Sequence, residues 1–335
     1  MSDARIRLRY LRDTVRLLYP GPGAPRAYSV LPHPVVPRRL APRRWWHPSP
    51  VVTLAVEGSI EAYLSEVFGV PVECVLRVRP ARRANRKPVL EAYSDGELLA
   101  FVKIGDTERA GALVANEAAT LSRLADVPLE TVVPPVVLHH GVWRELSVLA
   151  LSPLPIRRGR VSAELLTRAV KEIAATGGPA SAASSPPADD RARGTASDAP
   201  GDTVGDAMGD APGDTVGTAW HGDLSPWNIA PSGDGRLLVW DWERYQVGVP
   251  YGFDAVHHFF QRALRRMDPS TAARACLAQA VSVLAPLGLS AAQARLTTLR
   301  YLIALADRHA ADGWEPLGPP DTWLNPLVDH QELLA

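Results

Sequence analysis

The feature that most constrains this chain is a polar loop that is followed by an apolar run and an acidic turn. The loop reads HGDLSPWN (residues 221–228), so a histidine stands two residues before an aspartate and an asparagine five residues after that aspartate. The apolar run RLLVW (residues 236–240) is typical of a strand, and the acidic turn DWE (residues 241–243) follows it directly. A fold for this chain therefore has to place a strand between a polar loop and an acidic turn.

This spacing resembles the protein-kinase catalytic loop, His-x-Asp-x-x-x-x-Asn, which a metal-binding aspartate follows downstream. The motif His-Gly-Asp, in place of His-Arg-Asp, resembles the catalytic loop of the aminoglycoside phosphotransferase and choline kinase-like superfamily. The members of this superfamily are small-molecule kinases that share the two-lobed fold. DWE and the later GVPYGFD (residues 248–254) resemble the next segments of that superfamily. The resemblance covers roughly residues 70–312 apart from a low-complexity stretch. It implies an α+β, protein-kinase-like fold and transfer of the γ-phosphoryl group of ATP to a small hydroxylated substrate.

The resemblance also implies a role for each polar residue of the motif. Asp223 would accept the proton of the acceptor hydroxyl, and His221 would fix the loop by hydrogen bonding. Asn228 and Asp241 would bind Mg²⁺, which prefers hard oxygen ligands. Glu243 would either orient the loop or contact the acceptor, and the sequence leaves both roles open.

Upstream, the patterns predict the small lobe of such a fold. Strands are expected over residues 73–78, 89–93, 98–104 and 146–151, with an Asp95-Gly96 hairpin turn and a helix over 112–124. In this order the resemblance implies that Lys103 contacts the phosphates and that Glu117 holds the lysine in place. Alternatively, Lys103 is an exposed lysine on an edge strand and Glu117 is an ordinary acid on the surface of a helix.

Two further segments are expected to contact the nucleotide. Ser152 to Leu154 would form the hinge that meets adenine. The basic loop of residues 79–88, which includes Arg86, has no glycine where protein kinases have a Gly-rich loop. Its five cationic side chains either contact phosphate oxygens or form a solvated turn.

The chain divides into an Arg- and Pro-rich extension (residues 1–55), a small lobe (56–155) and a mainly helical large lobe (156–335). The extension, with ten arginines and two aspartates in its first 50 residues, is expected to be solvated, with a strand over 27–31 and with Trp45 and Trp46 as an anchor. A helix is expected over residues 54–68. Residues 174–219 are low in complexity and predict a disordered linker, because so few apolar side chains cannot offset the cost of ordering.

In the large lobe, helices are expected over residues 162–175, 253–266, 270–287 and 290–311, with Ser270 and Ser290 as N-caps and Gly288 as a stop. His257 and His258 lie on the second of these and are interpreted as core or surface residues rather than metal ligands.

The zero net charge gives no reason to expect nucleic acid or a membrane surface as a partner. Two cysteines and the lack of an 18-residue apolar run predict a cytoplasmic protein.

Two other classes of function stay open. A nucleotide-binding pseudokinase or partner module would explain the missing glycines and the few large-lobe helices. A metal-dependent hydrolase could use His221, Asp223, Asp241 and His257, but that scheme gives no reason for the asparagine at residue 228.

Overall fold

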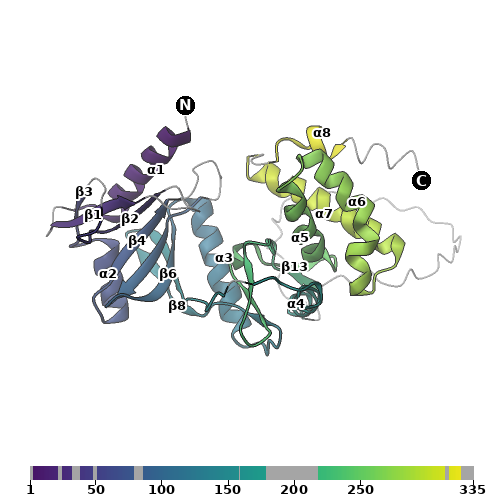
Figure 1. The fold of residues 1–335 in the computed structure, drawn as a ribbon, viewed down its shortest axis with the longest axis horizontal. Coiled ribbons are helices and arrows are strands. Elements are labelled where there is room, and N and C mark those ends of the chain that lie inside the picture. The colour runs from purple at the N-terminus through teal and green to yellow at the C-terminus, as the bar shows by residue number, and fades with distance from the viewer. Residues whose placement is uncertain are drawn as a thin grey trace, which may run out of the picture.

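The computed structural model describes residues 3–21, 25–31, 38–47, 51–78, 86–157, 159–178, 218–313 and 317–325. An antiparallel sheet dominates the N-terminal half of these residues, and helices dominate the C-terminal half (Figure 1). The sheet has the strand order β3-β1-β2-β4-β5-β6-β9-β8. Its strands are β1 (Pro25–Leu31), β2 (Arg38–Pro42), β3 (Val51–Ala55), β4 (Glu73–Val78), β5 (Val89–Ser94), β6 (Glu97–Gly105), β8 (Val137–Trp143) and β9 (Leu146–Leu151). The chain is therefore a mixed α/β protein.

The N-terminal segment differs from the solvated extension that the sequence predicts. Its described residues form α1 (Asp3–Leu18) and the strands β1 to β3, which complete one side of the sheet. Tyr28 and Leu40 are fully buried in the same core as β4 to β6. Trp45 and Trp46 are not an anchor, since their exposed fractions are 90% and 60%.

Ion pairs explain why an arginine-rich segment can join a sheet. Three of its arginines each meet a glutamate from a neighbouring element: Arg26 with Glu61 at 3.0 Å, Arg39 with Glu91 at 2.7 Å and Arg44 with Glu73 at 2.8 Å. The charges of these three arginines are thus matched by acids that lie 29 to 52 residues away in sequence.

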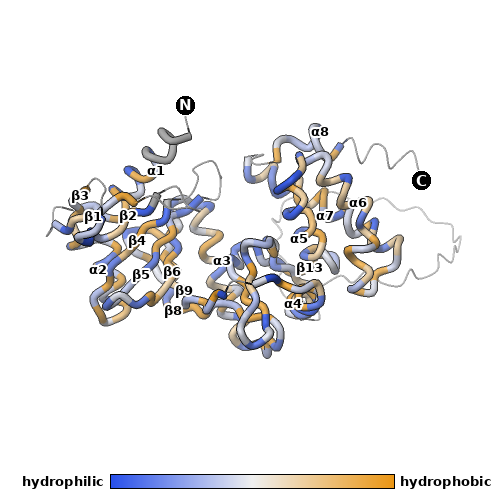
Figure 2. Tube along the Cα trace, in the orientation of Figure 1, coloured by the Kyte–Doolittle hydropathy of each residue, from blue (hydrophilic) through white to orange (hydrophobic). Residues whose placement is uncertain are grey.

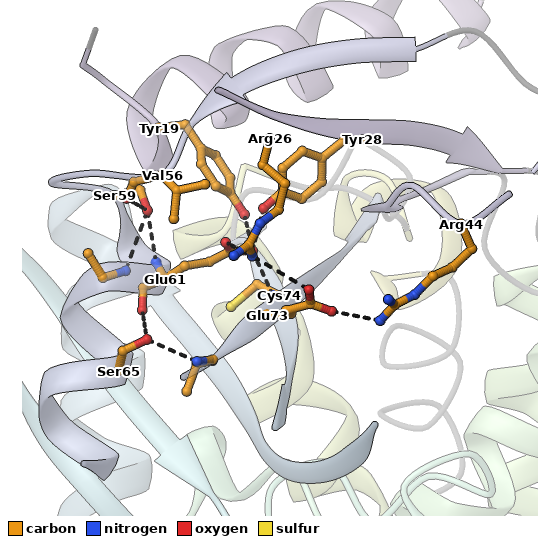
Figure 3. A network of polar contacts seen from close by, with 12 residues as sticks. Tyr19, Arg26, Tyr28, Arg44, Val56, Ser59, Glu61, Ser65, Glu73 and Cys74 are labelled. Atoms are coloured by element: carbon orange, nitrogen blue, oxygen red, sulfur yellow. Dashed lines mark hydrogen bonds and ion pairs between the residues drawn. The ribbon is translucent and has the colours of Figure 1, made fainter. Parts of the chain in front are cut away.

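Glu61 is the centre of the polar network that joins this segment to the sheet (Figure 3). It lies at the start of α2 (Ile60–Phe68), and its carboxylate has no exposure to solvent. It accepts hydrogen bonds from the hydroxyls of Tyr19 at 3.1 Å and Tyr28 at 2.6 Å, from Arg26 at 3.0 Å and from the Cys74 N–H at 2.7 Å. Four donors, two of them from β1, therefore converge on one buried acid.

The remaining predicted elements of this half are present. Asp95 and Gly96 have φ values of 50° and 85°, which fits the turn expected between β5 and β6. α2 begins after Ser59, whose hydroxyl caps it, so it is shorter than the helix expected from residue 54. α3 (Glu108–Leu124) packs against β6 and β9. The sequence patterns did not reveal β8.

The second group of elements combines helices with two small sheets. β7 (Val132–Val133), β11 (Ile229–Pro231) and β12 (Leu237–Val239) form one, and β10 (Thr218–Trp220) with β13 (Gln246–Val249) forms the other. The helices are α4 (Ala163–Ala175), α5 (Phe253–Leu264), α6 (Pro269–Leu284), α7 (Ala291–Ala311) and α8 (Pro320–Trp323), with the 3₁₀ turns η1 (Trp242–Arg244) and η2 (Ala285–Leu287). Ser290 caps α7 as expected, but Asp268 rather than Ser270 caps α6.

β9 separates the two hydrophobic cores. Leu149 and Leu151 pack into the core of the helical group, whereas Val148 and Ala150 pack into the core beneath the sheet. Successive side chains of a strand point to opposite faces, so one strand serves both cores. In Figure 2 hydrophobic residues are interspersed with hydrophilic ones in both groups, as expected where each element has one buried face.

The expected linker over residues 174–219 overlaps regular structure at both ends, because α4 continues to Ala175 and β10 begins at Thr218. Residues 179–217 lie outside the described part of the chain. Among the described residues no single helix has the length and apolar character needed to cross a membrane. Pro269–Leu287 and Ala291–Ala311 meet those two criteria only as a pair, bent by 115°.

Candidate active site

A short hairpin brings the polar loop of residues 221–228, here called the HGD loop, next to the acidic turn. β11 pairs with β12, and Ile229 lies opposite Val239. The Trp240 N–H donates to the Asn228 carbonyl at 3.1 Å, which extends the pairing by one residue. Asn228 and Asp241, the two predicted metal ligands, therefore lie at the same end of one hairpin.

The backbone of the HGD loop is held by Asp254, the second residue of α5. The N–H groups of His221 and Gly222 donate to its two carboxylate oxygens at 2.7 and 3.3 Å. Gly222 has a φ of 81°, and a Cβ atom there would lie 2.1 Å from the Arg244 carbonyl oxygen, so no other residue fits. The sequence marked Asp254 only as the end of a motif, and its anchoring contact was not predicted.

His221 lies inside this arrangement. Its Nδ1 accepts the Asp223 N–H at 3.1 Å, and its ring packs against Trp242 with 4.5 Å between ring centroids. Burial lowers the pKa of His221 to about 4, so the ring is neutral near pH 7. A neutral, buried histidine that bonds to the loop backbone fits the loop-fixing role expected for it.

The Asp223 carboxylate accepts hydrogen bonds from three side chains. Oδ1 contacts the Ser225 hydroxyl and His257 Nε2, the latter at 3.0 Å, and Oδ2 accepts from Asn228 Nδ2 at 3.0 Å. Burial acts to raise the pKa of Asp223, but the donors from His257 and Ser225 outweigh it and the pKa lies below its ordinary value. The side chain is 29% exposed, so the ionised carboxylate remains accessible.

The kinase resemblance gave His257 no role, and only the hydrolase alternative used it. It is fully buried on α5, and its Nδ1 lies 2.9 Å from the Tyr301 hydroxyl on α7. Burial lowers the pKa of His257, which favours the neutral ring. Because an ionised carboxylate only accepts, the proton must be on Nε2, and Nδ1 then accepts from Tyr301. The sequence signal was its position three residues after Asp254, which places both on one helix face.

Lys103, Glu117 and Asp241 meet in a second cluster, in which the predicted pairing of Lys103 with Glu117 is present. Lys103 Nζ donates to both Glu117 oxygens at 2.7 and 2.6 Å and to Asp241 Oδ1 at 2.6 Å. Glu117 has no exposure to solvent, and its Oε1 also accepts the Trp242 N–H at 3.2 Å. The lysine on β6 and the glutamate on α3 are thus bound directly to the acidic turn.

The carboxylates of this cluster determine the protonation state of Lys103. Burial alone would lower the pKa of Lys103, but the carboxylates of Asp241 and Glu117 outweigh it, and the pKa of Lys103 lies above its ordinary value. Lys103 is therefore positively charged. Asp241 has a φ of 73°, a conformation that non-glycine residues rarely adopt. Such a backbone conformation is stabilised by its surroundings. Here these are the ion pair of Asp241 with Lys103 and the hydrogen bond from the Trp242 N–H to Glu117.

Glu243 belongs to the same acidic group. Ligand atoms of Glu117, Asp241 and Glu243 lie within 4.8 Å of one another, so three carboxylates could share one cation. Glu243 also forms a buried ion pair with Lys87, the last cation of the basic loop. Asn228 uses its amide N–H₂ on Asp223, which leaves its amide oxygen as the atom that suits a metal ion.

The other predicted nucleotide contacts lie apart from this cluster or have partners of their own. The Arg86 guanidinium stacks on the Tyr10 ring at 4.8 Å. The Ser152 N–H donates to the Val136 carbonyl at 2.9 Å, and the Leu154 carbonyl accepts from the Ile156 N–H at 2.8 Å. A hinge contact through the Ser152 N–H would therefore require the bond to Val136 to break. Residues 79–85 of the basic loop lie outside the described residues.

Three kinds of comparison with known proteins were made, by family, by sequence and by structure. No protein-family model matches the chain, and no curated protein sequence matches it. A solved structure with a similar arrangement is that of a "Putative fructosamine-3-kinase" from Haemophilus somnus 129PT. The match covers 77% of this chain and 91% of that one, at 13% identity and a TM-score of 0.43.

Proposed function

We propose that this protein is an ATP- and Mg²⁺-dependent phosphotransferase that moves the γ-phosphoryl group to a hydroxyl of a small molecule. In this proposal the sheet with α3 is the small lobe of a kinase-like fold and the helical group is the large lobe. The observation that carries the proposal is the pair of clusters joined by the β11–β12 hairpin. One contains an accessible, ionised aspartate, and the other contains a lysine held by two carboxylates.

Asp223 would position the acceptor hydroxyl and receive its proton. Among the described residues, Oδ1 has two donors and Oδ2 has one, so Oδ2 keeps more capacity to accept the hydroxyl. A carboxylate with a lowered pKa is a weak base. Positioning is then its main contribution, which suits phosphoryl transfer, where the protein has little covalent chemistry to do.

Lys103 would bind phosphate oxygens of the nucleotide, and Glu117 would hold its amine in place. The two contacts between these side chains already fix the amine on the side of Asp241. Glu117 is fully buried between β6 and the acidic turn, where its carboxylate contacts Lys103 and the Trp242 N–H.

The acidic group fits Mg²⁺, which prefers carboxylate and carbonyl oxygens. Asp241, with Glu243 and the Asn228 amide oxygen, would hold the ion beside Lys103. When bound, Mg²⁺ neutralises charge on the phosphate oxygens.

A screen of hydroxylated compounds with ATP consumption as the readout tests the proposal. The panel should include sugars, amino alcohols, hydroxy acids and aminoglycosides, and the phosphorylated product should be identified by mass. Asp223→Asn is the control, because it keeps the shape of the side chain and removes its charge; turnover should fall about 10²–10⁴-fold. Magnesium-dependent ATP binding with no turnover of any acceptor would instead identify a nucleotide-binding module.

A further inference from the structure

Two lysines pair with the acidic group of Glu117, Asp241 and Glu243. Lys103 donates to both oxygens of Glu117 and to Asp241 Oδ1, at 2.6 to 2.7 Å. Lys87, the last cation of the basic loop, donates to Oε2 of Glu243. The three carboxylates that could share one metal ion are therefore already paired with lysine amines.

The two lysines are held to different degrees. Lys103 has two acidic partners, and it keeps the fully buried Glu117 if Asp241 turns to another cation. Among the described residues, Lys87 forms an ion pair with Glu243 alone. A competing cation at Glu243 would therefore take the whole ion pair of Lys87. Lys87 is thus the exchangeable cation of this group.

Glu243 stays in place when its partner changes. Asn116 on α3 donates to the backbone carbonyls of Glu243 and Tyr245 at 3.0 and 3.2 Å, and these bonds do not involve the carboxylate. The side chain of Glu243 is 6% exposed and that of Lys87 is 8% exposed. A charge buried to this extent is stable only with an opposite charge beside it. Loss of Lys87 would therefore leave Glu243 in need of another cation.

The charges of the acidic group favour exchange with a divalent ion. Its three carboxylates face two ammonium groups, which leaves one negative charge in excess. Without the Lys87 amine the excess is two, equal to the charge of Mg²⁺. The attraction between charges increases with their product and is stronger in a buried site than in water. Mg²⁺ and the Lys87 amine therefore compete for the same carboxylate.

The displaced lysine would keep an acid within reach of its charge. Asp106 follows β6 directly, and its Oδ1 is buried with no hydrogen-bond partner within the described part of the chain. Burial raises the pKa of Asp106, and the charges of Arg86 and Lys87 act in the opposite direction. Because Lys87 already acts on Asp106, release from Glu243 does not leave its charge without an acid nearby.

We propose that Lys87 is a built-in counter-ion of the metal site, which holds Glu243 while no divalent ion is bound and is displaced when Mg²⁺ binds. The exchange would couple metal binding to the position of the basic loop, because Lys87 belongs to that loop. The inference rests on the metal site of the proposed function but does not depend on phosphoryl transfer.

Titration with Mn²⁺ in the absence of nucleotide, followed by electron paramagnetic resonance of the free ion, tests the competition. Mn²⁺ prefers the same oxygen ligands as Mg²⁺. Lys87→Met should bind Mn²⁺ about tenfold more tightly than the wild type, because the competing charge is gone. Lys87→Arg keeps the charge and should bind like the wild type, and Asp241→Asn should lose the site.

Arg86→Gln is the matched control for net charge. It removes one positive charge from the neighbouring residue, whose exposed guanidinium stacks on Tyr10 and not on the acidic group. The Mn²⁺ affinity of Arg86→Gln should therefore stay within about twofold of the wild type, because its charge is screened by solvent.

A second measurement uses the wild type, so it does not depend on the folding of a variant. The chain has three lysines, Lys87, Lys103 and Lys171, and mass spectrometry after brief acetylation reports on each of them. Without divalent ions the exposed Lys171 should react, whereas the buried Lys87 and Lys103 should be protected. Saturation with Mn²⁺ should raise the acetylation of Lys87 about tenfold and leave that of Lys171 unchanged.

Equal Mn²⁺ affinity of the wild type and Lys87→Met would overturn the inference and leave the metal site of the proposed function standing. Acetylation of Lys87 that does not change on saturation with Mn²⁺ would overturn it in the same way. Mn²⁺ binding that Asp241→Asn does not weaken would place the ion elsewhere. That result, or no binding to either the wild type or Lys87→Met, would overturn both the inference and the proposed metal site.

Discussion

Nε2 of His257 lies 3.0 Å from Oδ1 of Asp223 and links α5 to the HGD loop. The second nitrogen of the same ring contacts the Tyr301 hydroxyl, so a chain of hydrogen bonds runs from α7 to the candidate catalytic carboxylate. Both His257 and Tyr301 are fully buried. A neutral ring between a hydroxyl and a carboxylate fixes the orientation of that carboxylate without adding a charge.

We predict that His257→Leu lowers kcat by about 10- to 100-fold and leaves KM for ATP nearly unchanged. The reason is the loss of one hydrogen bond to a charged group, about 1.5–3 kcal/mol, at a residue that does not face the nucleotide. Steady-state kinetics with an acceptor found by the screen measures the effect. His257→Gln should restore part of the rate, because its amide can donate in place of Nε2, and Tyr301→Phe should cause a smaller loss. Full kcat in His257→Leu would exclude this positioning role.

The buried ion pairs of Lys103 allow a test on stability that needs no substrate. Lys103→Met leaves Glu117 and Asp241 without their cation, and breaking a buried pair on one side costs about 3–5 kcal/mol. The double variant Lys103→Met with Glu117→Gln should recover part of this free energy of unfolding. Urea unfolding measures both, and Lys171→Met, at an exposed lysine on α4, is the control. Equal stability of the Lys103 and Lys171 variants would contradict the prediction.

Glu61 provides a test of the N-terminal segment. Glu61→Gln keeps the shape of the side chain but replaces an acceptor oxygen by a donor in a position surrounded by donors. At least one buried donor then loses its acceptor, at about 1–3 kcal/mol. The melting temperature should fall clearly, whereas Glu66→Gln, at an exposed position of the same helix, should have little effect. An unchanged melting temperature would mean that the network of Figure 3 does not hold the segment to the sheet.

Local patterns predicted those elements whose signals lie within a few residues. The Asp95-Gly96 turn and the cap Ser290 are examples. Asp268 displaced Ser270 as the cap of α6 because Pro269 favours the first helical position. The strands of residues 25–55 were largely missed because they are stabilised by glutamates far along the chain, which composition cannot reveal.

In the candidate site, too, the sequence indicated some residues and missed others. The resemblance assigned Lys103 and Glu117 to the phosphates and Asp241 to the metal ion, and the three side chains do meet. His257 and Tyr301 lie 34 and 78 residues after Asp223 on separate helices, so only the packing of α5 against α7 reveals their contact. A spacing rule cannot report such contacts, because it describes neighbours along one element.

The last prediction concerns stability and pH. His258 is 8% exposed and contacts the Leu224 carbonyl at 3.0 Å, and burial lowers its pKa to about 4. An unfolded histidine has a pKa of about 6.5, so between these values the unfolded chain binds more protons at this residue. The stability that His258 contributes is therefore complete above about pH 6.5 and is lost as the pH falls towards 4.

His258→Asn keeps a donor for the Leu224 carbonyl and removes the titration. Between pH 6.5 and 4.5 its free energy of unfolding should fall by about 2 kcal/mol less than that of the wild type, since one proton contributes about 1.4 kcal/mol per pH unit. Asp254 has the opposite effect on the free energy of unfolding. Burial raises its pKa to about 7, so its contribution to that free energy increases as the pH falls. Because Asp254 is present in both proteins, the difference between them isolates His258. His140→Asn, at an exposed histidine on β8, is the control. If urea unfolding at pH 4.5, 5.5 and 6.5 gave parallel curves for wild type and His258→Asn, His258 would not be held neutral by burial.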